Sequence, residues 1–129
     1  MTGKRNLALY RLGDGKEKLN SARILFDQGG FKDSVSRSYY AMFSAARALL
    51  ATKSVDSAKH SGVIALFHQC FVKTGIISKE YGKLLAKAKN VREESDYGDF
   101  VVVSREEAEI QLQQARAFIT EVENVLETK

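Results

Sequence analysis

An arginine and an aspartate, Arg92 and Asp96, stand at positions of the stretch KNVREESDYGDF where helical spacing would place apolar residues. Arg92 follows Leu85 by seven positions and Ala88 by four, so a helix would project all three side chains from one side. Asp96 comes one turn later on the same side. An unpaired charge there would carry a desolvation cost of several kcal/mol, so the guanidinium of Arg92 needs an anionic or polar partner.

The Arg92–Asp96 pair has two interpretations. In the structural one, the two side chains form an ion pair that fixes the end of the helix, where a cationic side chain also suits the helix dipole. In the functional one, Arg92 faces a phosphate or a carboxylate that comes from elsewhere. The residues alone leave both interpretations open.

A histidine and a lysine stand at the start of another predicted helix, in the stretch SAKHSG. His60 lies on the side of Ile64 and Phe67, and a lone histidine beside an apolar stripe is typical of a structural role. Lys59, His60 and the free backbone N–H groups of that helix start would also make an anion pocket. This second interpretation places both residues among the candidate binding residues.

Tyr39 and Phe43 belong to the apolar stripe that this helix is predicted to turn towards the core, and Tyr40 points about 100° away from that stripe. It shares a polar and partly basic face with Arg37 and Arg47. We expect these three residues to contact another chain or another helix rather than to catalyse a reaction. Simple exposure to solvent is the alternative for Tyr40.

Several kinds of site are excluded by the residues present. The sequence has no CxxC, no HExxH, no histidine and cysteine cluster at metal-ligand spacing, and no glycine-rich phosphate loop or GxSxG elbow. Its one cysteine, Cys70, lies in a strongly apolar helix, which predicts an inert thiol in the core. No metal site and no cofactor are predicted.

The composition is that of one globular domain over residues 1–129, with 44% hydrophobic and 28% charged residues. The chain has no proline, which favours an all-α fold. A net charge of +4 is compatible with binding nucleic acid or nucleotide without being diagnostic. One cysteine, no long apolar run and no signal-peptide pattern predict a cytoplasmic protein that does not enter a membrane.

Apolar periodicity predicts about five helices to position the candidate residues. The predicted ranges are about 16–28, 32–52, 58–73 and 79–94, followed by a last helix that begins with a capping box from Ser104 to Glu107. An extra turn over 7–12 would precede the first helix, interrupted by Gly13 and Gly15. The third helix is apolar over most of its circumference, which predicts a place in the middle of a bundle.

The order of several motifs resembles that of the HEPN domain family, in its small stand-alone branch. The motifs are FKDSVSRSYYAMFSAARALL, then KHSG before ALFHQCFVKTG, then VREESDYGDF, then a helix that opens SREEAE. The resemblance covers nearly the whole chain and implies an up-and-down bundle of about five helices that forms a homodimer. HEPN proteins are often encoded beside a minimal nucleotidyltransferase, as toxin and antitoxin.

Many HEPN proteins are metal-independent endoribonucleases with an arginine followed four to six residues later by a histidine. Arg92 matches the arginine of that motif, but Asp96 and Tyr97 stand where the histidine would be. A tyrosine with a pKa of roughly 10 is not a general base near neutral pH. The resemblance therefore favours binding over catalysis, although His60 could supply an imidazole from another helix.

Three hypotheses follow. The leading one is a protein that binds nucleotide or RNA, acts with a minimal nucleotidyltransferase partner and has a pocket formed by Arg92, Asp96, Tyr97, His60 and Lys59. The second is an endoribonuclease with a non-standard site. The third is a non-catalytic homodimeric adaptor in which the polar residues only fix the packing.

Overall fold

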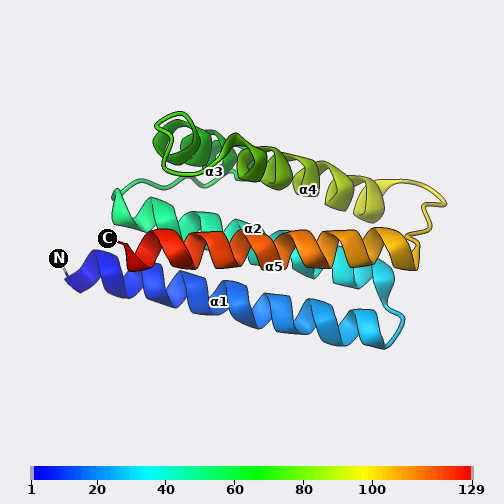
Figure 1. Cartoon of the computed structure of the whole chain (residues 1–129). Coiled ribbons are helices and arrows are strands. Elements are labelled where there is room, and N and C mark those ends of the chain that lie inside the picture. The colour runs from blue at the N-terminus through cyan, green and yellow to red at the C-terminus, as the bar shows by residue number, and fades with distance from the viewer. Residues whose placement is uncertain (1, 129) are drawn as a thin grey trace.

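Five α-helices and one π-helical turn form the described part of the chain, which is residues 2–128 of a computed structural model, with side chains from residue 3. The helices are α1 (Thr2–Asp27), α2 (Phe31–Thr52), α3 (His60–Phe67), α4 (Lys79–Tyr97) and α5 (Arg105–Glu127), and the π-helical turn η1 (His68–Val72) continues α3. The long helices run alternately in opposite directions, and no strand occurs among these residues (Figure 1). The predicted all-α bundle of about five helices is confirmed.

The helix α2 lies at the centre of the bundle and packs against α1, α3, α4 and α5. Its predicted apolar stripe is confirmed: Tyr39, Met42 and Leu49 are fully buried, and only Phe43 is half-buried. Since every other helix meets α2, side chains of this helix can contact residues that lie far apart in the sequence.

The prediction that the first helix begins near Lys16 is wrong. The helix α1 runs without interruption from Thr2, through both Gly13 and Gly15. A Cβ atom added to Gly15 would lie 2.9 Å from the backbone oxygen of Ala41, so this glycine lets α1 approach α2 closely. The packing of α1 against α2 outweighs the cost of about 1 kcal/mol that each glycine brings to a helix interior.

The prediction of a continuous, central third helix over 58–73 is also wrong. The α-helical part spans eight residues at the edge of the bundle beside α4, and only Val63 and Phe67 of it are buried (Figure 1). Its chain continues as a π-helical turn in which the N–H of Lys73 donates to the carbonyl of His68, five residues earlier, at 2.7 Å. Such a turn changes the register of the following side chains, and Cys70 is half-buried at the margin of the core rather than deep within it.

The helix α4 ends at Tyr97, three residues beyond its predicted end, so Asp96 and Tyr97 belong to its last turn. The predicted capping box at the start of α5 is confirmed, with the N–H of Glu107 donating to Ser104 Oγ at 3.1 Å and the N–H of Ser104 donating to Glu107 Oε1 at 3.4 Å. Among residues 2–128, each helix is too short or too polar to cross a lipid bilayer.

Candidate functional site

Arg92 projects from α4 towards two consecutive tyrosines of α2. The guanidinium carbon Cζ lies 5.1 Å from the ring centre of Tyr40 and 5.7 Å from that of Tyr39. The ring of Tyr97, one turn further along α4, is 5.8 Å away. A guanidinium within about 6 Å of an aromatic ring is attracted by the electrons of its face. These three rings therefore hold the cation in one place.

Asp96 completes the surroundings of the guanidinium. Arg92 Nε donates to Asp96 Oδ2 at 3.0 Å, and the two side chains are 13% and 26% exposed. The ion pair of the structural interpretation is therefore present, although Arg92 precedes the last turn of α4, and within residues 3–128 this is the only hydrogen bond that the guanidinium makes. Burial acts to lower the pKa of Arg92, yet Tyr40, Asp96 and Tyr97 outweigh it and raise the pKa, so the side chain stays cationic.

His60, the first residue of α3, meets the same part of α2. Its Nδ1 lies 2.9 Å from the hydroxyl oxygen of Tyr39, in a hydrogen bond whose donor depends on the tautomer of the imidazole. The imidazole stacks on Phe43 with ring centres 4.2 Å apart, and the ring of Tyr40 stands edge-on to it at 5.7 Å. Three aromatic side chains thus fix the orientation of the imidazole.

The charge state of His60 depends on α4. Burial lowers the pKa of His60, and the positive charges of Arg92 and Lys89 lower it further. The neutral imidazole is therefore favoured near pH 7. A neutral imidazole has one nitrogen that can accept a proton, which a protonated imidazole lacks.

These side chains form one group on one side of α2. We name it the arginine–histidine cluster and define it as Tyr39, Tyr40, His60, Arg92 and Asp96. Arg92 and His60 both contact the rings of Tyr39 and Tyr40. A fixed cation and a neutral imidazole can bind an anion such as a phosphate, while the Asp96 carboxylate orients the guanidinium and the aromatic rings can stack against a base.

The family model described as the HEPN domain matches residues 8–125. The chain belongs to the HEPN domain family. It is 39% identical to a protein of Methanocaldococcus jannaschii named "Putative toxin MJ0605", over 86% of this chain and 82% of that protein. It is also 34% identical to a UPF0332 protein of Thermotoga maritima, over 98% of this chain and 96% of that protein. The resemblance inferred from the motifs is confirmed.

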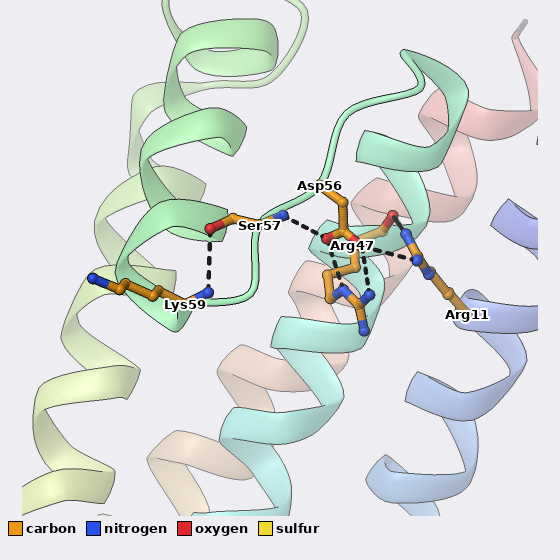
Figure 2. Close-up of polar contacts among 5 residues, drawn as sticks. All are labelled: Arg11, Arg47, Asp56, Ser57 and Lys59. Carbon is orange, nitrogen blue, oxygen red and sulfur yellow. Dashed lines mark hydrogen bonds and ion pairs between the residues drawn. The ribbon is translucent and has the colours of Figure 1, made fainter.

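Two further residues of the pocket predicted from the sequence lie outside the cluster. Tyr97 is 73% exposed at the end of α4, with its ring near Arg92. Lys59 is exposed at the start of α3, and its backbone N–H donates to Ser57 Oγ at 3.2 Å. Its side chain extends away from Asp56 (Figure 2). The structure therefore brings Tyr97 to the rim of the cluster and does not bring the Lys59 side chain into it.

The three interface candidates differ in their surroundings. Tyr40 is half-buried and contacts Arg92 and His60 of its own chain. The expected contact with another helix is therefore present. Arg37 is exposed. Arg47 is bound within the chain, since its Nη2 lies 2.7 Å from Asp56 Oδ2. An intermolecular role for these three residues stays a prediction.

Two contributors to the candidate site were assigned only to the core by sequence periodicity. Tyr39 is 1% exposed, but its hydroxyl reaches His60, and Phe43 stacks on the same imidazole. The signal for them was the run YYAMF itself, which places three aromatic rings within two turns of one helix. Aromatic residues at this spacing are typical of cores, and only the position of α3 distinguishes a site from a core.

Proposed function

We propose that this HEPN protein is the toxin-like component of a two-protein system with a minimal nucleotidyltransferase, and that its arginine–histidine cluster binds nucleotide or RNA through a phosphate. The observation that carries the proposal is the Arg92 guanidinium, fixed beside three tyrosine rings and 13% exposed. The toxin-like role is supported by two relatives in Methanocaldococcus jannaschii that carry the name "Putative toxin".

Phosphate is the ligand chemistry that best suits Arg92. A guanidinium presents five N–H donors in a planar fork that matches two phosphate oxygens, and Asp96 takes only the Nε donor. The Nη groups are therefore left for a ligand. The exposed ring of Tyr97 at the rim would stack against a base, as aromatic side chains do in sites for single-stranded nucleic acid.

One observation favours a second candidate, the metal-independent endoribonuclease with a non-standard site. His60 supplies an imidazole beside Arg92, and its lowered pKa favours the form that accepts a proton. In such a reaction His60 would take the proton of a ribose 2′-hydroxyl. The 2′-oxygen would bond to the adjacent phosphorus while the bond from phosphorus to the 5′-oxygen breaks, and that 5′-oxygen would take a proton from water. Arg92 would stabilise the charge on the phosphorus oxygens.

Binding is tested by fluorescence titration of the protein with ATP and with a short single-stranded RNA. We expect saturable binding, weakened about 10-fold or more by Arg92→Ala, because a hydrogen bond to a charged group contributes about 1.5–3 kcal/mol. The matched control is Arg23→Ala, which removes an arginine paired with Asp27 four residues on, at 3.5 Å on the exposed side of α1. The control should bind as the unaltered protein does.

Failure to bind either ligand, or an equal loss in both variants, would contradict the proposal. If Arg92→Ala lowers stability while no ligand binds the unaltered protein, the adaptor hypothesis is favoured instead. Cleavage is assayed separately, by incubating RNA with the protein in the presence of a metal chelator. Cleavage that leaves 2′,3′-cyclic phosphate ends and is lost in His60→Gln would establish the endoribonuclease.

A further inference from the structure

Asp56 lies at the centre of a second polar cluster, in the loop that joins α2 to α3 (Figure 2). Its carboxylate accepts two hydrogen bonds from Arg47 of α2, from Nη2 at 2.7 Å and from Nε at 3.2 Å. It accepts a third from Arg11 Nη2 of α1 at 3.1 Å. A two-point pairing of arginine with carboxylate has a defined geometry, so Asp56 is held in direction as well as in position.

The two arginines also join the helices to each other. Arg11 Nη1 donates to the backbone oxygen of Arg47 at 3.1 Å, so α1, α2 and the loop share one network. The hydrogen bonds from Arg47, aided by the N–H of Ser57 and opposed by burial, lower the pKa of Asp56 to about 2. Asp56 is therefore ionised throughout the physiological range, and the network does not loosen there.

Only three residues separate Asp56 from His60, and their backbone is constrained. The N–H of Ser57 donates to Asp56 Oδ1 at 2.8 Å, and the N–H of Lys59 donates to Ser57 Oγ at 3.2 Å (Figure 2). The Ser57 side chain packs so closely on the first turn of α3 that a Cβ atom on Gly62 would overlap it. A displacement of Asp56 would therefore also displace the start of α3.

We propose that Asp56 is a positioning residue for the arginine–histidine cluster. Held by Arg47 and Arg11, it fixes the loop so that His60 stays hydrogen-bonded to Tyr39 and close to Arg92. This inference deepens the proposed function. Only the expected effect of Asp56 on ligand binding rests on that function. Its structural content, the placement of His60, is measurable without any ligand.

The test is a pH titration of the histidine ring protons by NMR, in the unaltered protein and in Asp56→Ala. If His60 leaves its place, its imidazole loses burial and moves away from Arg92 and Lys89, so its titration midpoint should rise towards about 6.5, the value of a free imidazole. The signal of His68, exposed on η1, is a reference within the same spectrum.

The sign of the shift separates positioning from direct electrostatics. The charged groups that act on His60 are Arg92, Lys89 and Glu93 of α4 and Arg47 of α2. Removing the Asp56 carboxylate takes away a negative charge and leaves the charge of Arg47 unbalanced, so electrostatics alone would lower the midpoint of His60 further. A rise therefore supports positioning, and a fall or no change overturns it.

Two more variants complete the experiment. Asp56→Asn keeps the shape of the side chain but removes the charge that pairs with both arginines, and it should raise the midpoint by less than Asp56→Ala, which keeps the proposal testable if Asp56→Ala does not fold. Asp27→Ala, which removes the partner of Arg23 on α1, should leave the midpoint unchanged. Titration of the same variants with ATP should show weaker binding for Asp56→Ala than for Asp27→Ala. If neither the unaltered protein nor any variant binds ATP, the proposed function fails. The NMR result still decides whether Asp56 positions His60.

Discussion

At the scale of single residues, the chemistry of this protein depends on three groups that would be ordinary in isolation. Arg92 is an arginine of α4 that lies before its last turn, His60 is a helix-start histidine and Tyr39 is a core tyrosine. Burial and mutual contact change each of them: the pKa of Arg92 and that of Tyr39 are raised, and the pKa of His60 is lowered. The group therefore combines a permanent cation with a neutral imidazole.

The lowered pKa of His60 predicts how stability depends on pH. Between its folded-state pKa and about 6.5, His60 is protonated in the unfolded chain but not in the folded one. The neutral imidazole of His60 contributes fully to the free energy of unfolding above about pH 6.5, and this contribution is lost as the pH falls through the folded-state pKa. The free energy of unfolding should therefore decrease on acidification from about pH 7.5 to 5.5. Urea denaturation across this range measures the decrease.

The variant His60→Gln should lose part of that decrease, because glutamine does not titrate. Asp14 and Asp56 also have lowered pKa values, but carboxylates stabilise the fold above their unfolded-state pKa and lose this effect only at more acidic pH. The range above about pH 5.5 therefore isolates the histidine. An identical pH dependence in His60→Gln and in the unaltered protein would contradict the assignment.

At the scale of elements, the close approach of α1 to α2 depends on one glycine. Gly15 faces the backbone of Ala41, whereas Gly13, two residues earlier, has no atom within 4 Å of the place that a Cβ would take. The same helix thus contains a glycine required by packing and one that is not. The difference matters to the site because α1 supplies Arg11 to the network around Asp56.

Alanine substitutions at the two glycines should have opposite effects. Gly13→Ala should raise the free energy of unfolding by about 0.5–1 kcal/mol, because alanine favours the helix. Gly15→Ala should lower it by about 1–3 kcal/mol, because the new Cβ forces α1 away from α2. Urea denaturation of both variants measures the difference. Equal effects would show that α1 is not held against α2 at Gly15.

At the scale of the whole molecule, the arginine–histidine cluster lies beside an exposed apolar segment. The linker that follows α4 exposes Phe100 and Val102 fully or nearly so, and it directly follows Tyr97, the last residue of α4. Phe100 has a positive φ of 58°, a backbone conformation that non-glycine residues seldom adopt. Exposed apolar side chains next to a polar cluster are typical of surfaces that contact a partner.

The resemblance to HEPN proteins implies a homodimer, and this assembly is testable directly. Light scattering coupled to size-exclusion chromatography at micromolar concentration should give twice the mass of the chain, and the melting temperature should rise with protein concentration. Phe100→Ser should shift the protein towards the monomer if the linker lies in the interface, whereas Tyr10→Ser on α1 should not. A monomeric mass for the unaltered protein would contradict the homodimer.

Much of the fold and part of the site were predictable because they depend on local periodicity. The stripe of α2, the capping box at Ser104 and the inward direction of Arg92 follow from a repeat of 3.6 residues per turn. Arg92, Asp96 and His60 were recognisable as candidates because each places a polar group where packing alone would place an apolar one. The order of the motifs was also enough to indicate the HEPN family.

The start of α1, the short α3 and the roles of Tyr39 and Asp56 were not predictable in the same way, because each depends on contacts between elements. Helix propensity argues against a helix through Gly13 and Gly15, and packing on α2 overrides it. Asp56 is an ordinary loop residue until Arg11 and Arg47, from two other elements, meet at its carboxylate. In α2 and at Arg92, the sequence by itself determined which side chains face inward, since that follows from helix geometry. Only the tertiary structure decided which of them meet, since that depends on how the helices pack.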